Sequence, residues 1–79
     1  MLIHERLKSS DFLIRLGARI REKRERADLS QPIFAAMIGL SASTLSRIET
    51  GQNDVSIYRG ALIARALGTT LPKLLEGLL

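Results

Sequence analysis

Residues 31–50 read QPIFAAMIGLSASTLSRIET, with apolar residues on both sides of Gly39. Its apolar residues recur with helical spacing on both sides of Gly39, which predicts two short helices joined by a turn of three to four residues. Gly39 falls where the turn needs a left-handed backbone, a conformation in which a Cβ costs about 1–2 kcal/mol. Ser30 and Ser41 are the expected N-caps of the two helices, and Pro32 suits the first turn of the earlier one.

The two helices are expected to cross each other. Ala35 falls where the second helix would pass closest, because a larger side chain there would push the pair apart. The apolar residues that would meet the core are Phe34, Ile38, Leu40, Leu45 and Ile48. Residues left mostly outside the core are Ser41, Ala42, Ser43, Thr44, Ser46 and Arg47. The pattern indicates a helix-turn-helix, the unit that places its second helix in the major groove of DNA.

The rest of the chain also has helical periodicity, without sustained alternation of period two. Residues 2–8 form a short amphipathic segment that Ser9-Ser10 interrupt, and Asp11 is expected to cap a helix over about 12–27. Ser56 is expected to cap a fourth helix that runs to Leu67. Leu71-Pro72 are expected to open a last short helix that carries the leucines at 71, 74, 75, 78 and 79. We therefore expect an N-terminal extension over 1–10 and a compact, all-α, five-helix domain over 11–79, with the helix-turn-helix at about 31–50.

Composition excludes several classes of protein. The 79 residues include no cysteine and one histidine, His4, which excludes a disulfide framework, a Cys-type zinc site and a His-rich metal site. No apolar run approaches the roughly 18 residues that span a bilayer. No paired carboxylates, nucleophile–base set or phosphate loop is visible, so we expect no enzyme. The expectation is a cytoplasmic, nucleoid-associated protein without cofactor or metal.

The positive charge is concentrated at the front of the chain. The net charge is +4, and residues 1–26 carry all of this excess. Six cations fall within twelve positions: Arg15, Arg19, Arg21, Lys23, Arg24 and Arg26. Such a face fits contact with nucleic acid, contact with an acidic membrane surface, or simple solvation. All but Arg24 span several faces of one helix, so one or two are expected to approach a nucleic-acid backbone. Most are expected to be solvated and to act by long-range steering.

Five landmarks with gapless spacing carry a resemblance: Ile20-Arg21-x-x-Arg24, Leu29-Ser30-Gln31, Gly39-Leu40-Ser41, Leu45-Ser46-Arg47-Ile48-Glu49-x-Gly51 and Ile63-Ala64-Arg65-Ala66-Leu67-Gly68. In these, the chain from about Leu16 to Leu75 resembles the phage-repressor or Cro-type helix-turn-helix family, also called the xenobiotic-response-element-like family. The stretch from Tyr58 to Leu67 is also similar to the fourth helix of the lambda repressor. The resemblance implies a lambda-repressor-like fold and DNA binding.

The resemblance also implies roles for single residues. Gln31 would hold a DNA phosphate at a helix N-terminus, and Arg47 is the side chain able to bond guanine through two hydrogen bonds. Arg24 and Glu49 match a pair that forms an internal salt bridge in the family. The full set of expected DNA contacts is Gln31, Ser41, Ala42, Ser43, Thr44, Arg47, Thr50 and Asn53.

The sequence departs from the common family pattern at Pro32, where an acidic residue is frequent, and at Val55, where proline is common. Gly60 lies inside the expected fourth helix and indicates close packing against another helix or a partner. Because the recognition helix has small side chains apart from Arg47, shape readout and phosphate contacts are expected to carry much of the specificity. Phe34 and Tyr58 are expected to be core residues.

A helix-turn-helix of this size covers half a site, so a symmetric dimer is expected. The expected interface is the leucine-rich end: Leu71, Leu74, Leu75, Leu78 and Leu79. The alternative is that the first three complete the monomer core.

These features predict a sequence-specific transcription regulator, either a repressor or a controller-type autoregulator, that binds a palindromic double-stranded operator as a homodimer. Two alternatives stay open. One is an antitoxin that also binds its own operator, with residues 1–10 as candidates for contact with the toxin. The other is a protein-interaction module of the same fold.

Overall fold

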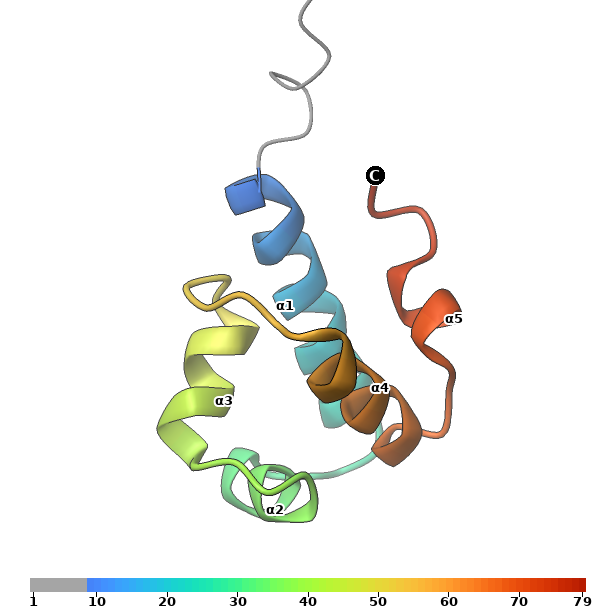
Figure 1. Ribbon diagram of the computed structural model, residues 1–79. Helices are drawn as coiled ribbons and strands as arrows, with labels where there is room; N and C mark the ends of the chain where they lie inside the picture. Colours follow the sequence, from blue (N-terminus) through green and yellow to red (C-terminus); the bar gives the residue numbers. More distant parts are fainter. Residues whose placement is uncertain (1–8) are drawn as a thin grey trace, which may run out of the picture.

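The fold is arranged around its longest helix, α1 (Ser9–Arg26), in a computed structural model that describes residues 9–79. Four helices follow: α2 (Gln31–Met37), α3 (Ala42–Glu49), α4 (Ile57–Ala66) and α5 (Leu71–Leu75). Figure 1 shows α1 passing behind α4, with α3 on one side and α5 on the other. Within residues 9–79 there is no strand, and the expected all-α fold of five helices is confirmed. None of these helices is both long and apolar enough to cross a membrane.

Each of the four later helices begins after a hydroxyl residue that caps it. The side-chain oxygen accepts a hydrogen bond from the backbone N–H three positions on, at 3.1–3.3 Å. Each such cap contributes about 1 kcal/mol to its helix. The caps are Ser30, Ser41, Ser56 and Thr70. The first three were predicted from the sequence, and Thr70 was not.

Two predicted helix boundaries were wrong. Helix α1 begins at Ser9, so Asp11 is not its cap but lies in its first turn, where a carboxylate is favoured by the helix dipole. The last helix ends at Leu75 and does not continue to the end of the chain, because Glu76 has ψ of 127° and Gly77 has φ of +76°. The amphipathic segment predicted over 2–8, with His4, lies outside the described residues.

Two arginines of α1 hold the chain beyond α5. Arg19 Nη1 donates to the carbonyl oxygen of Leu74, at 3.0 Å, and to that of Glu76. Arg15 Nη1 donates to the carbonyl oxygen of Leu78, at 2.9 Å. These bonds satisfy carbonyls that a continued helix would have paired with its own N–H groups. The sequence analysis did not predict these bonds, which fasten the last residues to α1 although Arg15 stays exposed.

The core joins all five helices. Its largest fully buried side chains are Ile20, Phe34, Leu45, Ile48, Ile63 and Leu74. Ala35, the predicted point of close approach between α2 and α3, is also buried. Gly39 has φ of +70°, as the turn between α2 and α3 requires.

Gly17 sets the distance between α1 and α3. A Cβ built on Gly17 would lie 2.4 Å from the carbonyl oxygen of Ile48 and 2.5 Å from that of Glu49. The end of α3 therefore lies directly against the backbone of α1. Gly60 also lies at a close contact, as predicted, but a Cβ there would meet the end of a side chain, Leu71 Cδ1 at 3.0 Å.

We expect Gly17→Ala to lower the free energy of unfolding by about 3 kcal/mol or more, because backbone oxygens cannot move aside without separating α1 from α3. Helix propensity alone predicts the opposite sign, a gain of about 1 kcal/mol. Gly60→Ala is the matched control and is expected to stay within about 1 kcal/mol, because the end of Leu71 can rotate away. Chemical denaturation of both variants measures the difference, and equal stabilities would contradict the close helix crossing.

Candidate nucleic-acid interface

The helix-turn-helix is closed by bonds around its turn. The backbone N–H of Leu40 donates to the carbonyl oxygen of Ala35, at 2.9 Å, across Gly39. Ile38 and Leu45 are buried, and Leu40 is half-buried against the same core. These contacts fix α3 relative to α2, so the outer face of α3 is presented by a rigid pair of helices.

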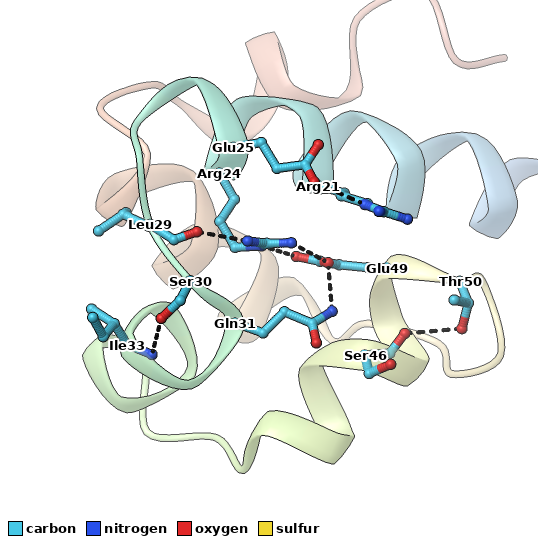
Figure 2. A network of polar contacts seen from close by, with 10 residues as sticks. All are labelled: Arg21, Arg24, Glu25, Leu29, Ser30, Gln31, Ile33, Ser46, Glu49 and Thr50. Carbon is cyan, nitrogen blue, oxygen red and sulfur yellow. Dashed lines mark hydrogen bonds and ion pairs between the residues drawn. The ribbon is translucent and has the colours of Figure 1, made fainter.

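One ion pair joins this motif to α1. Arg24 Nε donates to Glu49 Oε2 at 2.7 Å, and Arg24 Nη2 donates to Glu49 Oε1 at 3.1 Å, which gives the bidentate geometry of a strong pair. Both side chains are buried. The third guanidinium nitrogen, Nη1, donates to the carbonyl oxygen of Leu29 at 2.6 Å. The salt bridge implied by the resemblance is therefore present, and Figure 2 shows it between α1 and the end of α3.

The pair fixes the charge of Arg24. Hydrogen bonding to Glu49 raises the pKa of Arg24, and this outweighs burial, which acts in the opposite direction. A raised pKa contributes stability that is fully present below the ordinary pKa of arginine and is lost only as pH rises through the raised value. Arg24 therefore stays charged, and its contribution to stability is constant through the neutral range.

Gln31 is tied to the same carboxylate. Its Nε2 donates to Glu49 Oε1 at 2.9 Å, and Figure 2 shows the side chain reaching from the start of α2 to the end of α3. An amide nitrogen carries two protons, so one remains for a phosphate. Gln31 thus has a structural bond that the sequence did not predict, beside the phosphate contact that the resemblance implies.

The outer face of α3 presents a stripe of polar side chains. Ser43, Arg47 and Thr50 are exposed, and their spacing of i, i+4 and i+7 places them on one side of the helix. Arg47 makes no side-chain hydrogen bond or ion pair to any residue from 9 to 79. Ala42 and Thr44 are half-buried beside this stripe.

Ser41 is engaged in capping. Its Oγ accepts from the backbone N–H of Thr44 at 3.1 Å and donates to Thr44 Oγ1 at 2.9 Å. Ser43 Oγ lies 3.2 Å from Ser41 Oγ. Three hydroxyls therefore gather at the start of α3, and Ser41 and Ser43 are both exposed there.

The segment after α3 continues this polar surface. Thr50 Oγ1 donates to the carbonyl oxygen of Ser46 at 2.9 Å and accepts from Gln52 Nε2 at 2.9 Å. The backbone N–H of Asn53 donates to the carbonyl oxygen of Arg47 at 3.3 Å, and the Asn53 side chain is half-buried. Gln52, next to Asn53 in the same loop, is the more exposed of the two.

The basic residues of α1 are mostly engaged within the protein. Besides the buried pair and the two arginines that hold the C-terminal residues, Arg21 Nε lies 3.2 Å from Glu25 Oε2, and Arg26 Nη2 lies 3.2 Å from Glu22 Oε1. Both are exposed i,i+4 pairs of modest strength. The described part of α1 therefore carries no row of free cations toward a ligand.

The leucine-rich end is divided between the core and the surface. Leu74 and Leu78 are buried, while Leu71 and Leu75 are half-buried against the core. Leu79 alone is largely exposed, at 83%. Leu74 and Leu78 therefore complete the core of one copy, while Leu71, Leu75 and Leu79 keep exposed surface. Tyr58, expected in the core, is 73% exposed, whereas Phe34 is fully buried.

Comparison with known proteins places this arrangement among DNA-binding regulators. The sequence profile of the helix-turn-helix family matches residues 20–74. The control protein C.MunI from Mycoplasma sp is 39% identical over 66 residues, which make up 82% of this chain and 89% of that protein.

Solved structures give the same result. The restriction-modification controller protein C.AhdI from Aeromonas hydrophila has a TM-score of 0.75 and 35% identity, with 78% of this chain and 94% of that chain covered. The clp gene regulator ClgR from C. glutamicum has a TM-score of 0.78 and 28% identity, with 81% and 82% covered. Hydroxypropylphosphonic acid epoxidase from S. wedmorenis is 20% identical, and the match covers 35% of it, so that likeness is one of fold alone.

We expect Glu49→Ala to lower the free energy of unfolding by about 3–5 kcal/mol, because it leaves the buried guanidinium of Arg24 without its partner. Glu25→Ala, which removes the acid of an exposed pair, is the matched control and is expected to change stability by less than about 0.5 kcal/mol. Urea unfolding followed by circular dichroism measures both, and similar losses would contradict a central role for the buried pair.

Proposed function

This chain belongs to the helix-turn-helix family of Cro-type DNA-binding transcription regulators, and we propose that it is a controller-type autoregulator that binds a palindromic operator as a homodimer. The observation that carries the proposal is the outward stripe of Ser43, Arg47 and Thr50 on a helix whose other side is locked to α1 and α2. Similarity to C.MunI and C.AhdI supports the controller class. Such a protein would act beside the nucleoid in the cytoplasm.

The candidate contact residues would have different roles in DNA recognition. Arg47 would read a base edge, since its guanidinium is free and extends farthest from α3, while Ser43 would contact a phosphate or a base edge. Gln31 would hold a phosphate with its second amide proton while the first keeps it against Glu49. Ala42 and Thr44 would lie against the groove with their methyl groups, and Thr50 and Asn53 would meet the sugar-phosphate chain beyond α3. Ser41 would contribute mainly by capping α3.

The proposed homodimer rests on the size of α3, the helix that would contact the bases. One α3 spans about half a site, and specific affinity in this class of protein normally needs two copies about one helical turn of DNA apart. Because α3 is made of small side chains, the sequence-dependent shape of the operator would contribute to recognition as well. The antitoxin alternative receives no support from the relatives named above. The interaction module is the alternative that a DNA-binding experiment tests.

Selection from a random pool of DNA duplexes at physiological salt tests the proposal. We expect enrichment of an inverted repeat with half-sites centred about 10 base pairs apart, the spacing that a symmetric dimer requires. A pool without enrichment at protein concentrations that bind bulk DNA would contradict a sequence-specific regulator and favour the interaction module.

Arg47→Ala is expected to reduce affinity for the selected site by about 1–3 kcal/mol while leaving affinity for unrelated DNA nearly unchanged. Arg65, an exposed arginine in the last turn of α4, provides the matched control. Arg65→Ala is expected to leave the preference for the selected site over unrelated DNA unaltered. Fluorescence anisotropy with specific and scrambled duplexes measures both. An equal loss on the two duplexes would make Arg47 a phosphate contact.

Gln31→Ala is expected to weaken binding to specific and scrambled duplexes by the same factor, because a phosphate contact carries no sequence information. The same anisotropy titration measures it, with circular dichroism as the check that the variant is folded. A loss confined to the specific duplex would assign Gln31 to base reading.

A further inference from the structure

The loop that follows α3 is closed by its own backbone. The backbone N–H groups of residues 50–53 each donate to a carbonyl oxygen of α3, at 2.8–3.3 Å. Gly51 has φ of +78°, the left-handed conformation that lets the chain fold back over the end of a helix in this way. Because these backbone donors are all turned toward α3, a ligand that meets residues 50–53 must be bound by their side chains.

Thr50 has no proton left for a ligand. Its hydroxyl donates to the carbonyl oxygen of Ser46 at 2.9 Å, and Figure 2 shows this bond within α3 and its end. A hydroxyl carries one proton, so the Thr50 oxygen can otherwise only accept. The group that it accepts from is Gln52 Nε2, at 2.9 Å. Thr50 therefore belongs to the polar stripe on α3 but cannot donate to a phosphate without giving up its bond to Ser46.

Gln52 has the free donor of this pair. Its side chain is exposed, and its Nε2 carries two protons, of which Thr50 takes one. Within residues 9–79, the Gln52 amide makes no second side-chain hydrogen bond. Because Thr50 already holds the amide, less side-chain freedom remains to be lost when a ligand binds. One N–H of Gln52 is thus held outward beside the stripe.

Gln31 has the same arrangement at the start of α2. One of its amide protons is donated to Glu49, and the other is left for a ligand. Glu49 and Thr50 are consecutive residues at the end of α3. The two glutamine amides are therefore anchored next to one another in the chain, and each keeps one proton that the protein does not use.

We propose that Gln52 holds a DNA phosphate through its second amide proton and that Thr50 is the positioning residue that orients it. The inference rests on the DNA binding of the proposed function. Thr50 shares one side of α3 with Ser43 and Arg47, so the amide that it holds lies at the edge of the same surface. In a helix-turn-helix the N-terminal residues of the second helix contact the bases, which leaves the loop after α3 to the sugar-phosphate chain.

A base edge is the other part of DNA that an amide can bind. Adenine offers an acceptor and a donor that pair with the nitrogen and the oxygen of one glutamine, whereas a phosphate takes only the proton. A bond to adenine depends on the sequence of the duplex, and a bond to phosphate does not. The place of Gln52 beyond the end of α3 favours the phosphate, and the comparison of two duplexes separates them.

Fluorescence anisotropy with the selected duplex and a scrambled duplex tests the contact. We expect Gln52→Ala to weaken binding to both by the same factor, about threefold to tenfold, as loss of one hydrogen bond would. The slope of log affinity against log salt concentration is expected to stay unchanged, because a neutral amide neutralises no phosphate. Gln52→Lys is the matched comparison and is expected to steepen this slope by about 0.9.

Thr50→Val tests the positioning role, because it removes the hydroxyl and keeps the shape of the side chain. Alone, it is expected to lose part of the affinity that Gln52→Ala loses. Added to Gln52→Ala, it is expected to cause no further loss, since the side chain that it orients is then absent. Thr69→Val, at a half-buried hydroxyl between α4 and α5, is the control and is expected to leave affinity unchanged. Circular dichroism verifies that each variant is folded.

The outcomes distinguish the contact from the function. A loss confined to the selected duplex, or a shallower salt slope for Gln52→Ala, overturns the contact between a neutral amide and phosphate. Additive losses from Thr50→Val and Gln52→Ala overturn the positioning role. Unchanged affinity of Gln52→Ala, while Arg47→Ala keeps its effect, overturns the inference and leaves the regulator intact. A wild-type protein that binds neither duplex overturns the proposed function and the inference together.

Discussion

The carboxylate of Glu49 is the one group on which three helices depend. It lies at the buried end of α3 and takes two hydrogen bonds from Arg24 of α1 and one from Gln31 of α2. Burying two charges costs several kcal/mol of desolvation, which only excellent geometry and additional hydrogen bonds repay. Here the guanidinium also reaches the carbonyl of Leu29, so the segment entering α2 is fastened as well. The value of the pair lies in fixing geometry more than in net stability.

Close packing explains why such a pair can form. The absence of a side chain at Gly17 lets the last turn of α3 lie against the backbone of α1, and this approach brings Glu49 within reach of Arg24. The hydrogen bond to Glu49 then orients Gln31. The contacts of Glu49 with Arg24 and with Gln31 together fix the orientation of the outer face of α3. The surface stripe of Ser43, Arg47 and Thr50 is thus positioned by groups on the opposite side of the same helix.

Sequence reasoning predicted features that depend on local chemistry. The caps Ser30, Ser41 and Ser56 and the turn at Gly39 follow from residue type and spacing, which act within a few positions. It failed where partners lie far apart in the chain. The bonds from Arg15 and Arg19 to carbonyls about 55–63 residues away are invisible in a charge pattern.

The same reason accounts for misplaced side chains. Tyr58 was expected in the core, yet it lies in the first turn of α4 and is 73% exposed. The leucines of α5 looked too numerous for one helix face, but the chain turns after Leu75 and brings Leu78 back against the core. Gly17 was missed, although a glycine among Leu13, Leu16 and Ile20 on one helical stripe is the signal of a close approach.

The internal use of the arginines of α1 has a consequence for the search along the chromosome. Affinity for arbitrary DNA depends on how many phosphates are neutralised by direct contact, whereas attraction at a distance depends on the summed charge. Arginines that hold carbonyls and carboxylates keep their charge but make few such contacts. We therefore expect the summed charge to speed the first encounter with DNA, while these arginines add little to retention on the wrong sequence. Less of such a regulator is expected to be bound to the rest of the genome, so that occupancy of its operator would follow the amount of protein made.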